Sequence, residues 1–413
     1  MTFTQHREGK YKLNSLTLKS ANAPLDISKL VALVDIYESI LNPTPVMILN
    51  IIDGVGLLNG FVFQECKINI SFTTYEESNP VDYTFTVVSA DVSENVDNRQ
   101  KLIILTGVSE EAVMSKNMIQ PITIKKIGSA SLVKAYLDKL ETKKELFLEQ
   151  TRGLHSYDIT NITPFTVIDL IRFGAMSAEY NGHAFVFFEN KHGYHFKSIE
   201  KLIEEGLKNV GDKMYIHSDA ARTDVENNTS RNILAYKVAP TNSAYVASMI
   251  GGFFNKVKMV YLKTQETTLY EVKAKNLTFK SLNNGSFTTS AETVNKRGRS
   301  EASVDLIMYN SDYENHQYGE KLNQLPYFMS GFLNTTLNIT AWGDTTVTVG
   351  DVIACKIPAR TGKTNDTGDD PIISGNYLVC KCRHTLSFNE NAEYIQSFEL
   401  IKDGVAGEAI EVR

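Results

Sequence analysis

Three histidines in one short stretch are the first candidates for chemistry. His183, His192 and His195 lie close together in the chain, with Glu189 between the first two. Imidazole and carboxylate groups are common zinc ligands, and a histidine can also act as a general base. However, the surrounding sequence predicts a β-hairpin that places His183 at the start of a strand and His192 in the turn, where polar residues are ordinary. We therefore interpret the three histidines as structural, with a metal site or a hydrolytic site at this hairpin as the alternative.

A second group of candidate ligands lies near the C-terminus. Cys380, Cys382 and His384 alternate along a predicted strand, so they share one face of it. Two thiolates and an imidazole could bind zinc, but the sequence offers no second paired motif. Free cysteine also behaves as a small core residue, and we interpret these thiols as buried and apolar. With Cys66 and Cys355 the cysteines are too few and scattered for a disulfide framework, which favours folding in the cytoplasm.

Known catalytic motifs are missing from the sequence. It has no Walker loop, no nucleophile elbow and no H-E-x-x-H pattern. Asp366, Asp369 and Asp370 lie in a polar loop without the ligand spacing of an EF-hand, and we interpret them as solvated. We predict no catalytic residues and no cofactor.

Composition is that of a folded protein with several domains. The 413 residues are 42% hydrophobic and 22% charged, and no apolar run approaches the roughly 18 residues of a membrane span. The N-terminus shows no signal peptide. A net charge of -6 argues against binding nucleic acid by phosphate neutralisation. The same charge is compatible with a surface that nucleic acid passes without binding.

Strand patterns dominate both ends of the chain. Residues 333–357 alternate apolar and polar side chains and contain two glycine turns, and two further strands follow before residue 402, which together predict a small antiparallel barrel or sandwich. Residues 1–126 contain about six predicted strands, which together predict an N-terminal β-barrel domain. In the second of these predicted strands, residues 30–40, Val34, Ile36 and Ile40 alternate with Asp35, Tyr37 and Ser39.

The middle of the chain has a different pattern. Residues 129–144 show helical spacing, and Thr163 followed by Pro164 predicts the start of a helix over 164–179. A hairpin and a helix begun by Ser198 and ended by Gly206 follow. The order helix, hairpin, helix predicts an α+β insert over residues 127–232.

Three stretches resemble one known family. GDTTVTVGDVIACKIP together with IISGNYLVCKCRHTLSFNENAEYIQSFELIKD is similar to the C-terminal signature of baseplate hub subunits of contractile-tailed bacteriophages, a family shared with the hub half of type VI secretion spike proteins. IYESILNPTPVMILNIIDGVGLLNGF resembles the opening of these proteins, and NITPFTVIDLIRFGAMSAEYNGHAFVFFENKHGYHFKSIEKL resembles their middle domain. The resemblance implies an α+β, mainly β fold with two tail-tube-like antiparallel β-barrels and an α+β insert between them. It implies that residues 233–275 supply the first strands of the second barrel, 276–332 an insertion with a flexible loop and a helix, and 333–413 the remainder.

A structural role follows from this resemblance. It implies a homotrimeric ring that adapts the hexameric tail tube to a central spike on a separate chain, contacts wedge or other baseplate proteins, and lines a channel for phage DNA. Such a protein is not an enzyme, and it belongs to the virion after assembly in the host cytoplasm. We expect a subunit contact at the apolar residues Ala244, Tyr245, Met249, Phe253 and Phe254. The alternatives are a β-rich hydrolase or carbohydrate-active enzyme at the histidine hairpin, and a receptor-binding tail protein.

Overall fold

The structure is a computed structural model of the whole chain. It describes residues 9–20, 24–54, 56, 58, 61–63, 66–74, 79–95, 100–217, 231–238, 254–261, 264–273, 279–283, 304–310, 319, 321–322, 324–325, 328–329, 335–359, 368–370, 372–388 and 392–403. In these residues no helix is long and apolar enough to span a membrane.

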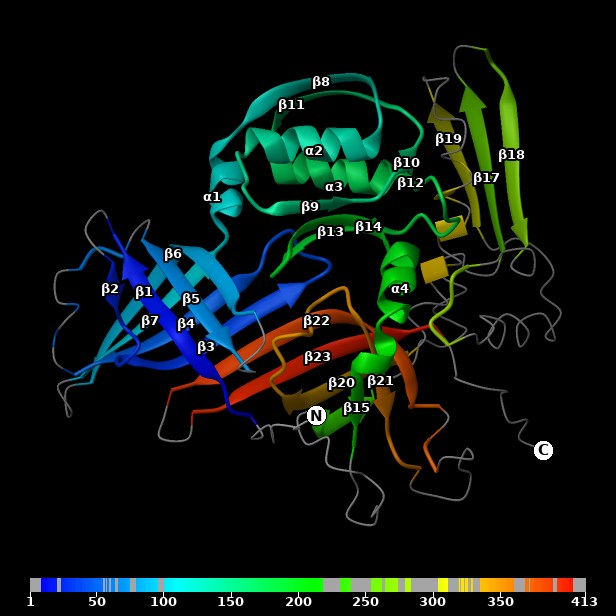
Figure 1. Cartoon of the computed structure of the whole chain (residues 1–413). Helices are drawn as coiled ribbons and strands as arrows, with labels where there is room; N and C mark the ends of the chain where they lie inside the picture. The colour runs from blue at the N-terminus through cyan, green and yellow to red at the C-terminus, as the bar shows by residue number, and fades with distance from the viewer. Residues whose placement is uncertain are drawn as a thin grey trace.

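Most of the described strands belong to one large sheet (Figure 1). Its first group of strands, in blue, comes from the N-terminal part of the chain: β1 (Lys12–Lys19), β2 (Leu25–Asp26), β3 (Val31–Ser39), β4 (Val46–Asp53), β5 (Lys67–Thr73), β6 (Val81–Asn95) and β7 (Gln100–Val108). Its second group comes mainly from the C-terminal part: β15 (Met214–Ile216), β16 (Ile233–Val238), β20 (Thr335–Trp342), β21 (Val352–Lys356), β22 (Gly375–Ser387) and β23 (Tyr394–Lys402). The two groups meet where β3 pairs antiparallel with β22.

A smaller α+β unit lies over this sheet (Figure 1). Its helices are α1 (Glu110–Asn117), α2 (Ser129–Lys139), α3 (Pro164–Gly174) and α4 (Ile199–Leu207), with a 3-10 turn at Val210–Asp212. Its strands are β8 (Gln120–Ile127), β9 (Glu145–Leu148), β10 (Thr151–Arg152), β11 (His155–Ile162), β12 (Met176–Ser177), β13 (Phe185–Asn190) and β14 (Gly193–Ser198). The structure confirms the prediction of a mainly β protein.

Strand β13 joins the α+β unit to the large sheet. All six of its residues are buried, because its two faces serve two cores. Phe185 and Phe187 pack with α2 and α3, whereas Val186 and Phe188 pack with α4 and the second strand group. The alternation of side chains along a strand separates these two sets. A run of apolar residues here therefore marks a strand covered on both faces.

The helix ends follow the sequence signals in part. Ser198 caps α4 by accepting a hydrogen bond from the amide of Lys201 at 3.2 Å. Pro164 begins α3 as expected, but the Thr163 hydroxyl bonds the Thr166 hydroxyl at 2.8 Å instead of capping the helix. Helices α2 and α3 end at Lys139 and Gly174, before the expected limits of 144 and 179.

Several strands pair differently from expectation. Of the strands expected over residues 233–275, β16 pairs with β20, but β17 (Phe254–Tyr261) and β18 (Thr267–Lys273) form a separate sheet with β19 (Val304–Asn310). The expected domain boundary at residue 126 would assign β8 to the first group of strands, but β8 pairs with β11 of the α+β unit. β15, inside the expected insert of 127–232, pairs with β21 in the large sheet. Alternation along a strand predicts its two faces but not its neighbour.

Candidate functional site

The seam between β3 and β22 positions two groups of polar side chains, one on each face of the sheet. Its register runs from Lys381 opposite Ser39 to Ser387 opposite Leu33. Side chains on each strand alternate between the two faces of the sheet. The seam therefore presents one set of residues to the outside and another to the interior of the two strand groups.

The outer face of the seam carries ion pairs. The guanidinium of Arg383 donates to both carboxylate oxygens of Asp35, at 3.0 and 2.9 Å, and it lies 5.4 Å from the ring centre of Tyr37. The Thr385 hydroxyl donates to Asp35 at 2.6 Å. Hydrogen bonding to Asp35 raises the pKa of Arg383 further. A groove of about 560 Å³ lies here, lined among others by Lys237, Asn338, Lys381 and Glu399. Charged and polar side chains therefore line much of this groove.

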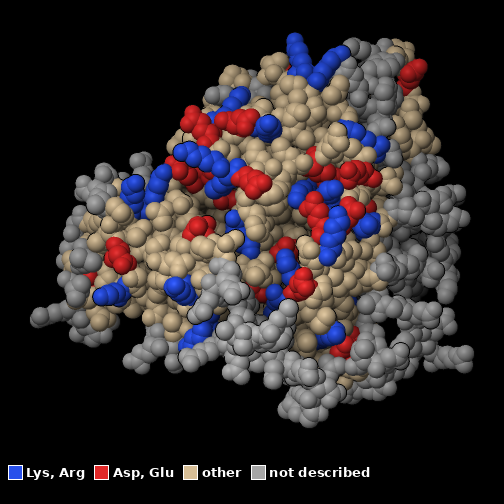
Figure 2. Space-filling view, viewed as in Figure 1, with Lys and Arg blue, Asp and Glu red and all other residues tan. Residues whose placement is uncertain are grey.

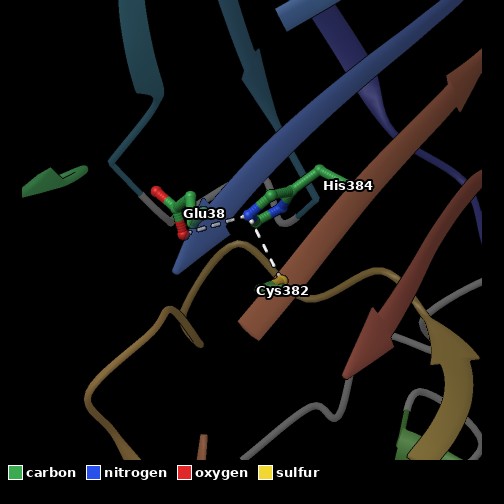
Figure 3. A group of neighbouring side chains, drawn as sticks. All are labelled: Glu38, Cys382 and His384. Atoms are coloured by element: carbon green, nitrogen blue, oxygen red, sulfur yellow. Dashed lines mark hydrogen bonds and ion pairs between the residues drawn. The ribbon is translucent and has the colours of Figure 1, made fainter. Parts of the chain in front are cut away.

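The inner face of the seam carries a buried polar cluster, which we call the seam cluster: Glu38, Cys382 and His384 (Figure 3). Nε2 of His384 lies 3.3 Å from Oε2 of Glu38 and 3.4 Å from Sγ of Cys382. All three residues are buried. Cys382 stands directly opposite Glu38 in the register, so the sheet itself brings them together.

Further side chains hold each member of the seam cluster. The Tyr83 hydroxyl donates to Oε1 of Glu38 and the Thr348 hydroxyl donates to Oε2, both at 2.8 Å. Nδ1 of His384 lies 2.7 Å from the Tyr394 hydroxyl, and Nε2 of Gln396 lies 3.8 Å from Sγ of Cys382.

Burial and hydrogen bonding act on the charges of this cluster in opposite directions. Burial would raise the pKa of the Glu38 carboxyl, but the hydrogen bond and charge of His384 and the two donated hydroxyls hold it below its usual value. Burial raises the pKa of the Cys382 thiol well above its usual value.

The three hairpin histidines have separate partners. His183 precedes β13 with a φ of 52°, and its two ring nitrogens contact the Arg152 guanidinium at 3.1 Å and the Ser177 amide at 3.3 Å. Burial and then the charge of Arg152 lower its pKa to about 3. His195 stacks between two phenylalanine rings and bonds the Asn190 side chain at 2.9 Å. Burial, followed by the charge of a nearby lysine, lowers its pKa to about 3.

His192 lies in the turn with much of its surface exposed, and the partial removal of water from its ring by neighbouring protein atoms, then the charge of Lys191, lower its pKa. Within the described ranges, three or more metal-ligating side chains converge at the seam cluster and not at this hairpin.

Strand β22, which carries Cys380, Cys382 and His384, contributes only two of these three residues to the cluster. Cys382 and His384 do meet, but the third member is Glu38 from the N-terminal strand group, and Cys380 is buried outside the cluster. Sequence reasoning missed Glu38, which is 346 residues from His384. A signal existed: Glu38 falls in phase with the apolar residues Ile36 and Ile40.

The remaining candidates are dispersed. Asp369 is buried beside Pro358, and Asp370 accepts the amides of Ile372 and Ile373 at 2.8 and 3.1 Å. Asp366 lies outside the described residues.

Most residues of the expected subunit contact lie outside the described part of the chain. Ala244, Tyr245, Met249 and Phe253 lie outside the described residues, and Phe254 begins β17 with its side chain undescribed.

Comparison with known proteins identifies the fold. No protein-family model and no curated protein sequence matches the chain. Among solved structures, the tail protein from Neisseria meningitidis MC58 aligns with a TM-score of 0.55 at 11% identity, over 96% of this chain and 97% of that one. The 43 kDa tail protein of prophage MuSo2 from Shewanella oneidensis aligns with a TM-score of 0.58 at 10% identity, over 95% of this chain and 99% of that one. The chain therefore shares the fold of these two tail proteins, one of which comes from a prophage. This finding confirms, for the fold, the resemblance to the baseplate hub family.

Proposed function

We propose that this protein is a structural hub subunit of a phage tail baseplate. Three copies would form a ring that seats the hexameric tail tube on one side and a separate spike protein on the other. Wedge or other baseplate proteins would bind its periphery. It would be assembled in the host cytoplasm, become part of the virion and act without catalysis.

The observation that carries this proposal is the end-to-end likeness to two tail proteins, one of them from a prophage, over at least 95% of both chains. A match of this extent concerns the whole arrangement of both strand groups and the α+β unit, rather than one common motif. In our interpretation the two strand groups correspond to two tube-like barrels. Three subunits with two such units each offer six similar surfaces, which would match a sixfold tube ring.

Charge supports passage of DNA rather than its retention. Lysine and arginine side chains alternate with aspartate and glutamate on the face seen in Figure 2, and the net charge of the chain is -6. A surface without a basic surplus has little tendency to neutralise phosphates. We expect the channel wall of the ring to be polar or acidic.

Molecular mass and shape in solution test the proposal. A trimer of the 46.2 kDa chain has a mass of about 140 kDa, three times that of the monomer, and sedimentation equilibrium separates the two. We expect a trimer, and ring-shaped particles with a central hole in electron micrographs. If the ring forms only with its partners, the chain alone would be monomeric. Co-expression with the tube and spike proteins of the same tail is the control for this case. A chain that remains monomeric under both conditions would contradict the proposal.

A further inference from the structure

We propose that the seam cluster of Glu38, Cys382 and His384 binds a zinc ion, which joins the two strand groups of the large sheet. The cluster offers a thiolate, an imidazole and a carboxylate, all of them ligand types of zinc. Their residues come from β3 and β22, so the ion would bridge the seam from its inner face (Figure 3).

The two separations between His384 and the other ligand atoms match those around a tetrahedral zinc ion. Bonds of about 2.0 Å to nitrogen or oxygen and about 2.3 Å to sulfur place neighbouring ligand atoms roughly 3.3 to 3.6 Å apart. Nε2 of His384 lies 3.3 Å from Oε2 of Glu38 and 3.4 Å from Sγ of Cys382, and the three ligand atoms all lie within 4.8 Å of one another.

The surroundings have the form of a metal site's supporting shell. A histidine ligand usually holds its second ring nitrogen on a hydrogen-bond partner, and a carboxylate ligand is itself hydrogen-bonded. Here Nδ1 of His384 meets the Tyr394 hydroxyl at 2.7 Å, and the free oxygen of Glu38 accepts from Tyr83 at 2.8 Å. Nδ1 also lies 3.3 Å from the side-chain amide nitrogen of Gln396; in the tautomer that protonates Nδ1 and donates to Tyr394, the lone pair of Nε2 would be available to the ion.

Charge balance also favours zinc at this buried position. A carboxylate away from water is costly unless it is compensated. Zinc with the Cys382 thiolate, the Glu38 carboxylate and neutral His384 makes a site of zero net charge, and the thiol proton leaves to solvent. Zinc with three protein ligands keeps a fourth position for a solvent molecule. Because the site exists only once β3 and β22 have paired, the ion would be taken up during folding.

Two metal measurements test this inference. We expect the tag-free full chain, folded with zinc and dialysed, to retain one zinc per chain by elemental analysis. Refolding with cobalt should give sulfur-to-cobalt charge-transfer absorption and the visible bands of a tetrahedral ion. Folded wild-type protein that retains no zinc and shows no such absorption would overturn the proposal, without any variant being needed.

Matched variants locate the ion. Cys382→Ser should abolish the cobalt absorption, whereas Cys380→Ser, which changes a buried cysteine two residues away outside the cluster, should leave it unchanged. Tyr394→Phe should weaken zinc binding by about tenfold to a hundredfold. Far-ultraviolet circular dichroism shows whether each variant folds. Cobalt absorption that persists in folded Cys382→Ser, or that depends on Cys380 instead, would also refute the site.

Discussion

Replacing Lys321 by methionine should change how the stability of the protein depends on pH. The Lys321 side chain is buried, with 1% exposure, and its ammonium donates to the backbone oxygens of Ala175 at 2.6 Å and Arg172 at 3.3 Å. These oxygens lie at the end of α3, where a positive charge is favourable. Burial, and then the charge of Arg172, nevertheless lower the pKa of Lys321 to about 7.

The size and sign of the effect follow from this pKa. In the unfolded chain a lysine has a pKa of about 10.4, so between pH 7 and that value unfolding takes up a proton. The cost of burying the ammonium is complete below pH 7 and is relieved as the pH rises, which makes the folded state more stable in this window. From pH 7 to 9 the wild type should gain about 2 kcal/mol relative to Lys321→Met, at 1.36 kcal/mol for each full unit.

Denaturant unfolding at pH 6, 7, 8 and 9 measures this difference. Circular dichroism follows the helices, and fluorescence of Trp342, the single tryptophan, follows the second strand group. Lys381→Met is the control, because that lysine side chain is 48% exposed and pairs with Glu399 on the surface. We expect the difference in unfolding free energy between Lys381→Met and the wild type to stay constant across this pH range. Parallel pH curves for Lys321→Met and the wild type would refute the reasoning about the buried ammonium.

Two further predictions concern the hairpin turn and the seam. Gly193→Ala should lower the free energy of unfolding by about 2 to 4 kcal/mol, because Gly193 has a φ of 138° and a Cβ there would lie 2.2 Å from the backbone oxygen of Glu145. Gly211→Ala is the control. A Cβ at Gly211 would have no atom within 4 Å, so this substitution should lower the free energy of unfolding by less than about 1 kcal/mol. Equal effects in thermal unfolding would contradict this. A double-mutant cycle of Asp35→Ala and Arg383→Ala should give a coupling of about 1 kcal/mol, since the Arg383 side chain is 46% exposed; zero coupling would show that the pair does not strengthen the seam.

Local features were predictable because their causes are local. Alternating side chains located β20 and β23, and Ser198 located the start of α4. The partners of strands were not predictable in the same way. Nothing in the pattern of β17 indicates that it pairs in parallel with β19, because pairing depends on surfaces that meet only in the folded chain.

The seam cluster shows the same limit for a site. Cys382 and His384 were noticed as neighbours on one strand face, since a period of two is visible in the sequence. Glu38 was not, because the register between β3 and β22 decides which residue stands opposite Cys382. An acidic residue in phase with Ile36 and Ile40 is the one local sign that a buried partner exists.

The seam also bears on how the two strand groups work together. Leu386 and Tyr394, from β22 and β23, pack into the core of the N-terminal strand group, so the groups share buried side chains as well as backbone hydrogen bonds. A shared core resists relative movement, since separating the groups would expose it to water. A subunit built in this way holds its two strand groups at one fixed angle. The proposed ring of three subunits would need that property, because six similar surfaces match a sixfold partner only if the spacing within each subunit equals the spacing between subunits.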